Sequence, residues 1–458
     1  MTAGALAPGE ALPPVRELAE LLGVNANTVA AAYRALRDRG TVETRGRAGT
    51  RVRERPGTSV RQRPYAIPEG TKDVSMGTPD VDLLPRLSPP AHIDVSVYRY
   101  AAAQPELEEQ LRRRLARNVA LRSAPDDAAA ATAAELIGQS ELLPVHGSLD
   151  GIDRLLATHT RPGDKVAVED PAWGNLLDLT ASRGLSPLPM RVDDEGPAPA
   201  DLRAALAAGA RVVIVTARAQ NPYGAVVSAR RAKLLRAALS AHPEVLTIDD
   251  DHGADLTVEA PHLLCGATRA WAYLYSASKA YGPDLRIAAL AGDADSIDRV
   301  SGQLKHTARN VSGVLQQLWA TALADSGHDA VLEQATRAYA ANRDGLIDEL
   351  AKYGIEAHGA SGLNVWIPVP DETAAATGLL ARGWAVAPGS WFRLHSGPGI
   401  RVTIAGLHAP AERAALAEAV AAVLGVGAGP GGWHGRGRGH GHGHGRGVPR
   451  GERVEEIV

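Results

Sequence analysis

Residues 271–292 read W-A-Y-L-Y-S-A-S-K-A-Y-G-P-D-L-R-I-A-A-L-A-G, and the interpretation of the whole chain starts from them. The runs 271–275 and 286–291 are short and apolar, which is typical of buried strands. Lys279 lies between them. A buried ammonium group costs free energy unless it is paired or chemically used, so this lysine needs an explanation.

Two explanations of Lys279 stay open on these residues alone. In the first, the lysine extends from a loop into solvent and has no special role. In the second, it forms a Schiff base with a ligand whose phosphate is held by Ser276, Ser278 and Arg286. The second explanation requires the rest of a ligand pocket to appear elsewhere in the chain.

The composition is that of a soluble globular protein. The chain has 458 residues, 45% of them hydrophobic and 22% charged, and it is long enough for more than one domain. Its single cysteine, Cys265, excludes an internal disulfide. The sequence contains no apolar stretch of about 18 residues and no signal-peptide pattern, so a cytoplasmic protein without a membrane segment is predicted.

The charge is unevenly distributed along the chain. The net charge is -3, but between Arg34 and Arg63 ten arginines stand against Asp38, Glu43 and Glu54. A basic block beside an acidic remainder indicates a nucleic-acid-binding module attached to another domain.

The N-terminal residues have the pattern of a helix-turn-helix followed by a wing. Residues 15–22 have helical spacing and end at Gly23, and Asn25 is a good cap for a second helix that ends at Gly40. Residues 41–53 alternate as a two-stranded wing would. The residues expected to face inward are Leu18, Ala19, Leu22, Val29, Ala32, Tyr33 and Leu36.

This arrangement predicts a DNA-binding surface. The second helix would enter the major groove and present Asn27, Thr28 and Arg34 to the bases. The arginines of the wing would hold phosphates; they are Arg45, Arg47 and Arg51. The alternative is a small helical cap whose arginines are only solvated.

Three blocks in this region, L-P-P-V-R-E-L-A, V-N-A-N-T-V-A-A-A-Y-R-A-L and G-R-A-G-T-R-V, resemble a GntR-type winged helix. The resemblance implies that Arg16 also contacts DNA. It also implies a further helix before the A-P-G-E stretch, whereas only residues 1–7 precede Pro8. Without that helix, Leu12, Leu18 and Val29 are expected to lose packing partners.

The middle of the chain alternates strands and helices, with polar residues after each strand. Gly147 and Ser148 follow the strand 142–146 and begin a helix, which is a pattern for binding an anion. Trp173 follows the strand 165–169, where it could stack on an aromatic ligand or close the core.

Two more strands end in polar groups. Asn221 lies in an N-P-x-G turn after the strand 211–216. After the strand 245–248, three aspartates and His252 follow one another, and three buried carboxylates need partners. A cation such as a protonated pyridine nitrogen is one possible partner, and a metal ion is the alternative. The alternation from residue 142 to 291 predicts a mostly parallel sheet with helices on both faces.

The chain becomes helical after residue 293, with a long helix at 329–353. A smaller mixed domain follows, with strands at 363–369, 385–388 and 400–404 and a last helix at 411–424. Arg401 lies in its last strand and, on this pattern alone, could be a surface arginine.

The motif S-x-S-K with an arginine seven residues on, together with the other motifs in this order, resembles the fold-type-I enzymes that use pyridoxal 5′-phosphate (PLP). The resemblance implies an α/β large domain and a smaller α+β domain. It implies that Lys279 forms the Schiff base and that Arg401 clamps a substrate carboxylate. The implied cofactor contacts are Gly147, Ser148, Ser276, Ser278 and Arg286 to the phosphate, Trp173 to the ring face, Asn221 and His252 to the ring oxygen, and Asp250 to the ring nitrogen. His252 stands where a tyrosine is common.

The two resemblances together are those of the MocR (GabR-like) group of bacterial transcriptional regulators. They imply a homodimeric, PLP-dependent DNA-binding protein whose effector is an amino acid, an amine or PLP itself. In the PLP family, an arm equivalent to residues 73–90 crosses the partner subunit. The alternative is a working aminotransferase with a vestigial DNA-binding module.

The predicted domains are a winged helix-turn-helix at 1–55, a linker at 56–72, a large domain at 73–310, a long helix with the small domain at 311–425, and a tail at 426–458. The tail is rich in glycine, histidine and arginine and cannot form a core. Its histidines His440, His442 and His444 could bind a metal weakly, but a flexible tail without a metal is expected.

Overall fold

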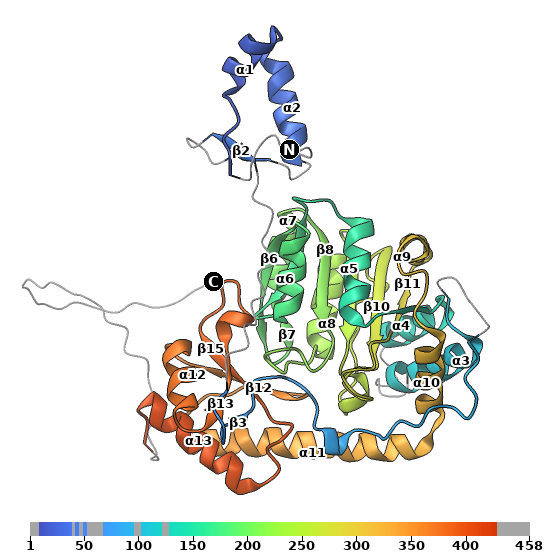
Figure 1. Ribbon diagram of the computed structural model, residues 1–458, viewed down its shortest axis with the longest axis vertical. Helices are drawn as coiled ribbons and strands as arrows, with labels where there is room; N and C mark the ends of the chain where they lie inside the picture. The colour runs from blue at the N-terminus through green and yellow to red at the C-terminus, as the bar shows by residue number, and fades with distance from the viewer. Residues whose placement is uncertain are drawn as a thin grey trace, which may run out of the picture.

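The computed structural model describes residues 9–38, 42–44, 49–52, 67–95, 102–120 and 128–427 (Figure 1). The predicted tail, most of the predicted linker, and Arg45 and Arg47 lie outside these residues. The domain boundaries proposed from the sequence stay predictions.

The N-terminal module has the predicted helix-turn-helix and wing. Helix α1 (Val15–Leu22) ends at Gly23, which has φ +62°, and α2 (Ala26–Asp38) follows. The side-chain oxygen of Asn25 accepts a hydrogen bond from the backbone N–H of Asn27 at 2.8 Å, as the predicted cap requires. Strands β1 (Val42–Thr44) and β2 (Thr50–Val52) pair antiparallel.

The small core of this module differs from the predicted one at two positions. Ala19, Val29 and Tyr33 are buried, and Leu12 and Leu18 pack against them, so these leucines do have partners. Leu22, however, is 60% exposed, and Ala32 is exposed as well. The prediction that they face inward is wrong, because α1 and α2 bury only the stripe along which they touch each other.

The large domain is built on an eight-stranded sheet with the order β4-β11-β10-β9-β8-β5-β6-β7. All of its neighbouring strands are parallel except that β11 is antiparallel to both of its neighbours and β7 is antiparallel to β6. The strands are β4 (Leu143–Val145), β5 (Lys165–Asp170), β6 (Ser186–Asp193), β7 (Gly196–Pro197), β8 (Ala210–Thr216), β9 (Leu246–Asp251), β10 (Ala270–Ser276) and β11 (Ala288–Gly292).

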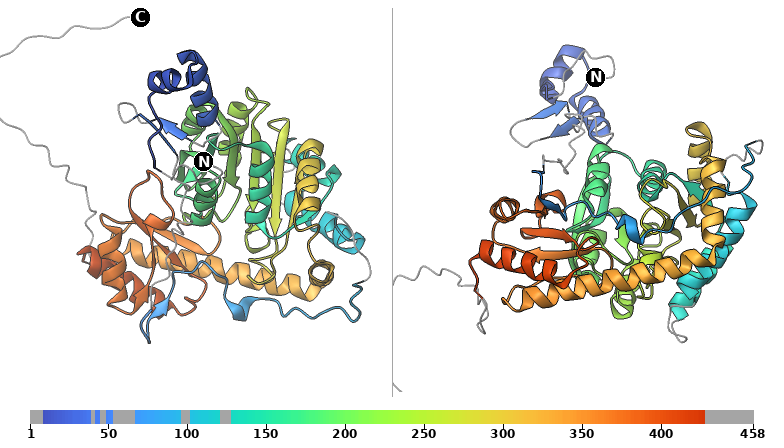
Figure 2. Two further views of the ribbon diagram at one scale, coloured as in Figure 1. Left: turned by 45° about the horizontal axis from the view of Figure 1, so that its top comes forward. Right: turned by 60° about the horizontal axis from the view of Figure 1, so that its bottom comes forward.

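Helices cover both faces of this sheet, as predicted. On one face lie α5 (Ser148–His159), α6 (Gly174–Ser182) and α9 (Ala294–His306). The other face carries α7 (Pro199–Ala207), α8 (Ala229–Leu239), α3 (Pro105–Leu115), α4 (Ala128–Gln139) and α10 (Gly313–Ala324). Figure 2 shows these layers from two further directions. No helix in the described ranges is both long enough and apolar enough to cross a membrane.

The small domain packs on the long helix α11 (Ser326–Ala351), which also runs beneath the large sheet in Figure 1. Its sheet has the order β12-β15-β14, flanked by helices α12 and α13. The predicted strand 385–388 is instead two short strands with different partners, β3 and β15. The elements are β12 (Asn364–Pro368), α12 (Glu372–Leu380), β13 (Trp384–Ala385), β14 (Ala387–Pro388), β15 (Gly399–Thr403), α13 (Pro410–Leu424) and β3 (Lys72–Asp73).

Two attachments join the small domain to the large one. The carboxylate of Asp170, at the end of β5, accepts hydrogen bonds from the backbone N–H groups of residues 394, 395 and 396 at 2.7–2.8 Å. The carbonyl of Gly224 accepts from the N–H groups of Ala360 and Ser361 at 2.9 and 2.8 Å.

Three further boundaries differ from the expected ones. Helix α3 ends at Leu115, and the chain continues to Ala120 as a π-helical turn. Arg286 precedes β11 instead of beginning it. The three aspartates 249–251 belong to β9 instead of following it. This last difference matters because neighbouring residues in a strand point to opposite faces.

Candidate functional site

The sheet order brings most of the predicted pocket residues to one edge. Strands β4, β5, β8, β9 and β10 run in the same direction, so the residues that follow them meet at their carboxyl ends. The predicted residues that follow or end these strands are Gly147, Ser148, Trp173, Asn221, Asp250, His252, Ser276, Ser278 and Lys279.

One end of the site is a cradle for an anion. Gly147 precedes α5 with φ +89°, and a Cβ atom on it would lie 2.9 Å from Nη2 of Arg286. Nη1 of Arg286 donates to Oγ of Ser278 at 3.4 Å, and Ser276 Oγ accepts from the Ser278 N–H. Ser148 is buried, and its Oγ has no hydrogen-bond partner among the described residues. A helix N-terminus, hydroxyls and a guanidinium group therefore converge here.

Lys279 lies in the middle of the site. Its Nζ donates to the backbone carbonyl of Gly77 at 2.6 Å. Burial, followed by the nearby charges of Arg401 and Arg286, lowers the pKa of Lys279 to about 8, while Asp250 acts in the opposite direction. An amine with such a pKa is unprotonated in an appreciable fraction of molecules near neutral pH, which makes it a nucleophile.

Two of the three aspartates in β9 are bound by the protein itself. The carboxylate of Asp249 accepts hydrogen bonds from the backbone N–H groups of Leu264 and Cys265, and burial raises the pKa of Asp249 to about 7. Asp251 forms a bidentate ion pair with Arg218, at 2.9 and 2.7 Å, and both side chains are completely buried. These two carboxylates hold the sheet together.

Asp250 points elsewhere. Its Oδ2 lies 3.1 Å from Nδ1 of His252, and its Oδ1 is buried without a partner among the described residues. His252 lines one hollow together with Asn221 and Lys279. Asp250 is thus placed to receive a hydrogen bond from a cationic ring nitrogen, whereas its two neighbours are not. Within the described ranges, no group of three potential ligands is arranged around a metal position.

Arg401 is buried and is not a surface arginine. It is only 2% exposed, and β15 is the central strand of its sheet. Nη1 donates to the side-chain oxygen of Asn221 at 2.9 Å, and Nη2 donates to the carbonyl of Ser75. The guanidinium lies 4.7 Å from the ring centroid of Phe392, and its Nε has no partner in the described part of the chain. Burial lowers the pKa of Arg401, but a guanidinium group stays charged in proteins.

Trp173 is the one predicted pocket residue that no described contact connects to the others. It caps the N-terminal end of α6, and it packs partly buried against the core that lies under α5 and α6. Its position beside β8 follows from the sheet order alone. The two interpretations of this side chain, ring stacking and core packing, both stay open.

Sequence reasoning missed the two residues that close the hollow. Ser75 and Gly77 contact Arg401 and Lys279 through their backbone carbonyls, and Gly77 also lines the hollow. No side-chain pattern could have indicated these contacts. With residues 75–77 in this position, the hollow around Lys279 has a free volume of only about 20 Å³.

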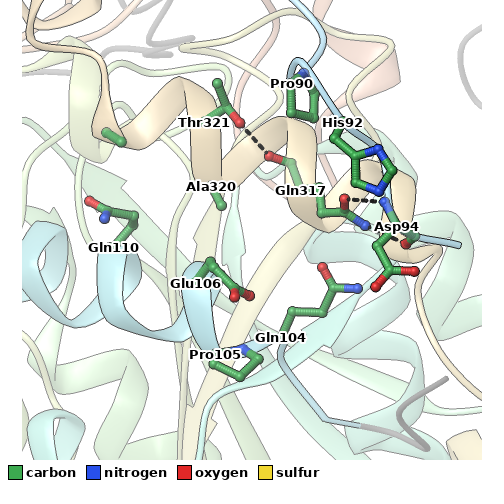
Figure 3. Close-up of a pocket in the computed structure, with 11 residues that line it drawn as sticks. Pro90, His92, Asp94, Gln104, Pro105, Glu106, Gln110, Gln317, Ala320 and Thr321 are labelled. Carbon is green, nitrogen blue, oxygen red and sulfur yellow. Dashed lines mark hydrogen bonds between the residues drawn. The ribbon is translucent and has the colours of Figure 1, made fainter. Parts of the chain in front are cut away.

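A larger hollow, of about 550 Å³, lies between α3, α10 and the segment 90–94 (Figure 3). Gln317 crosses it, and its side-chain oxygen and nitrogen bond to the backbone N–H and carbonyl of Asp94 at 3.0 and 2.8 Å. No lysine or arginine and none of the predicted site residues lines it. It therefore lacks the charge that a phosphate would require.

The predicted DNA-contacting residues lie on the surface of the N-terminal module as far as they are described. Arg16, Asn27 and Thr28 are exposed. Arg51 is partly buried, and its Nη1 donates to the carbonyl of Gly9 at 2.9 Å. The side chain of Arg34 lies outside the described part of the structure, as do Arg45 and Arg47.

Two family models match the chain. The model for aminotransferase class I and II matches residues 94–420, and the model for bacterial regulatory proteins of the gntR family matches residues 1–52. Together they cover most of the chain, in the order that the sequence predicted.

Among curated proteins, the vitamin B6 salvage pathway transcriptional repressor PtsJ of Salmonella typhimurium is 36% identical over 422 residues, which are 89% of this chain and 92% of that protein. The HTH-type transcriptional regulator TauR of Rhodobacter capsulatus is 28% identical over 55% of this chain and 53% of that protein. The aspartate/prephenate aminotransferase of Thermus thermophilus is 26% identical over 64% of this chain and 76% of that protein.

Solved structures agree on the fold. An archaeal alanine:glyoxylate aminotransferase superimposes with a TM-score of 0.66 at 20% identity, over 78% of this chain and 91% of that chain. An aspartate aminotransferase of Thermus thermophilus superimposes with a TM-score of 0.63 at 22% identity, over 78% of this chain and 98% of that chain.

Proposed function

Because the chain belongs to the aminotransferase class I and II family and carries a gntR-family module at its N-terminus, we propose that it is a PLP-dependent transcriptional regulator that binds DNA. The observation that carries the proposal is the position of Lys279 between an anion cradle and Asp250.

The chemistry of three buried atoms fits PLP. Ser148 Oγ, Asp250 Oδ1 and Arg401 Nε are buried polar atoms that have no partner among the described residues. A phosphate, a protonated ring nitrogen and a carboxylate would satisfy them in that order. Since unsatisfied buried polar atoms are costly, such a set supports a ligand carrying these three groups, or PLP together with a carboxylate-bearing effector.

Each residue has a distinct task in this proposal. Gly147, Ser148, Ser276, Ser278 and Arg286 hold the phosphate, and Asp250 keeps the ring nitrogen protonated. Lys279 is the nucleophile, and its lowered pKa supplies the unprotonated amine. Asn221 and His252 face the ring oxygen, Trp173 faces the ring, and Arg401 binds a carboxylate. When bound, PLP supplies an aldehyde carbon that reacts with amines and a ring that withdraws electrons.

We favour PLP itself as the sensed ligand over an amino acid or amine. PtsJ is named for vitamin B6 salvage, and it is matched over 92% of its length. A regulator of Corynebacterium glutamicum that is 27% identical over 55% of this chain is named for pyridoxine biosynthesis. The proposal includes a homodimer, a DNA operator as partner and a cytoplasmic location.

A working aminotransferase is the second candidate function. The observation in its favour is that both Lys279 and the buried Arg401 are present, as substrate turnover would require. Incubation with an amino acid and a keto acid distinguishes the two functions, because steady transamination is expected only of the enzyme.

The test of the cofactor site is an absorbance spectrum of the purified protein with added PLP. Wild type is expected to develop a visible band that survives gel filtration, and Lys279→Ala is expected to lack it. DNA binding is tested in parallel by a mobility shift with fragments upstream of bacterial vitamin B6 genes. A wild-type protein that retains no PLP would overturn the proposed cofactor, and one that binds no DNA would overturn the proposed regulator.

A further inference from the structure

Residues 72–77, here called the strap, form an added edge of the small domain. Lys72 and Asp73 make up β3, which pairs in parallel with β13. The N–H of Val74 donates to Ala385 at 2.9 Å, and the carbonyl of Val74 accepts from Thr403 at 2.8 Å. Five residues farther along β3 and its continuation, the strap has crossed from the sheet edge to the pocket.

The strap occupies both cations of the proposed ligand site. The carbonyl of Ser75 accepts from Arg401, and the carbonyl of Gly77 accepts from Lys279 at 2.6 Å. A neutral carbonyl is a weaker partner for a cation than a carboxylate is. A ligand that engages either cation therefore has to replace a carbonyl of the strap.

Gly77 fixes how closely the strap approaches. Its φ of +66° favours glycine, and a Cβ atom there would lie 3.1 Å from Nη1 of Arg401. Its N–H donates to Oγ1 of Thr403 at 2.9 Å, so the strap is held on both sides of Arg401. The small volume left around Lys279 follows from this approach.

The strap is also where the tether of the DNA-binding module ends. The predicted linker runs from residue 56 to residue 72, and its last residue is the first residue of the strap. A change in the strap is thus transmitted covalently to the segment that carries the winged helix. No other connection in the sequence joins the module to the pocket.

We propose that the strap couples ligand binding to DNA binding: a ligand on Lys279 or Arg401 displaces the carbonyls of Gly77 and Ser75, and the released strap changes the reach of the winged helix. The proposal rests on the proposed function and names its regulation. Because coupling between two sites is reciprocal, DNA has to change the affinity for PLP by the same factor by which PLP changes the affinity for DNA.

The test compares Gly77→Ala with Gly70→Ala. Both glycines have positive φ, +66° and +81°, but a Cβ atom at Gly70 would meet nothing within 4 Å. DNA affinity is measured by fluorescence anisotropy with and without PLP, on a duplex that wild type has selected from a random pool. For wild type and Gly70→Ala, PLP is expected to change the affinity by roughly 5-fold or more, within the usual range of coupling factors. For Gly77→Ala, this ratio is expected to fall to about one, because the strap is already displaced.

Hydrogen exchange of the wild-type protein gives a second readout that does not depend on any variant. The amides of Val74 and Gly77 are hydrogen-bonded, and their peptides are expected to exchange faster once PLP is bound. Unchanged or slower exchange would overturn the proposal, as would a wild-type ratio in a folded Gly77→Ala that binds PLP. A wild-type protein that binds neither PLP nor DNA refutes the proposed function instead, so the two failures are distinguishable.

Discussion

Arg401 and Asn221 are joined by a hydrogen bond of 2.9 Å, from a strand of the small domain to a turn of the large domain. The bond links two proposed functions, since Arg401 is the carboxylate clamp and Asn221 the partner of the ring oxygen. A carboxylate that draws Arg401 away also releases Asn221. The position of one group therefore depends on whether the other is engaged.

The lowered pKa of Lys279 predicts a pH-dependent stability. A lysine whose folded-state pKa is about 8 destabilises the fold most below pH 8, and this cost disappears as the pH rises from 8 towards the unfolded value of 10.5. Lys279→Met is expected to raise the free energy of unfolding of the PLP-free protein at pH 7 by about 1–3 kcal/mol. Urea unfolding at pH 7 and pH 9.5 measures the gap, which should be smaller at the higher pH.

Lys305→Met is the matched control for this measurement. Lys305 is exposed near the end of α9, so its replacement is expected to change the stability equally little at both pH values. A gap for Lys279→Met that stays constant between the two pH values would contradict the assignment of its pKa.

The neighbouring aspartates in β9 predict opposite phenotypes. Asp250→Asn removes a charge from the ligand site, and PLP affinity is expected to fall by roughly 10- to 100-fold, since a hydrogen bond to a charged group contributes about 1.5–3 kcal/mol. Asp251→Asn leaves Arg218 buried without its ion-pair partner, and about 3–5 kcal/mol of stability should be lost. Spectral titration and urea unfolding separate the two effects. Equal loss of stability in both variants would argue against the ligand role of Asp250.

The close contact of Gly147 with Arg286 predicts selectivity for the phosphate. Gly147→Ala places a methyl group where Nη2 of Arg286 lies, so PLP binding should weaken by about 10-fold or more, which corresponds to about 1.4 kcal/mol. Binding of pyridoxal, which has no phosphate, should change much less. Competition titrations with the two compounds measure the preference.

Gly163→Ala serves as the control for the strained backbone at that site. Gly163 has φ +96°, and a Cβ atom there would meet nothing within 4 Å. If Gly163→Ala lost as much PLP affinity as Gly147→Ala, general destabilisation would explain the result, and the anion cradle would not.

Two exposed residues of the N-terminal module predict different changes in DNA binding. Arg16→Ala should weaken binding to all sequences and reduce the salt dependence of log K by about one ion per contacted phosphate. Asn27→Ala should keep the salt dependence and relax the preference at one base position, at a cost of about 1–3 kcal/mol. Anisotropy titrations at several salt concentrations distinguish the two. Unchanged binding by both variants would show that the DNA is held elsewhere.

The sequence predicts the fold and the approximate pocket because both depend on side chains with clear patterns. Lys279, Asn221 and the anion cradle follow strands whose apolar runs are easy to recognise, and parallel strands bring such residues to one edge. The functional division among the three aspartates could not be predicted to the same extent. It depends on the strand direction of each side chain, and residues 249–251 were expected after the strand.

Contacts made by the backbone were not predictable at all. Ser75 and Gly77 act through carbonyl groups, which every residue has, so their proximity to Arg401 and Lys279 depends on the packing of the whole chain. The exposure of Leu22 has a related cause. Helical spacing identifies an apolar face, but it does not say how much of that face a neighbour covers.

The two attachments of the small domain have a geometrical consequence. Asp170 fixes residues 394–396, and Gly224 fixes residues 360 and 361. Two fixed points define a line, so the motion left to the small domain is a hinge rotation about that line. Opening and closing then become movements along a single angle, and a substitution at either point can tilt the axis while every ligand-contacting side chain stays unchanged.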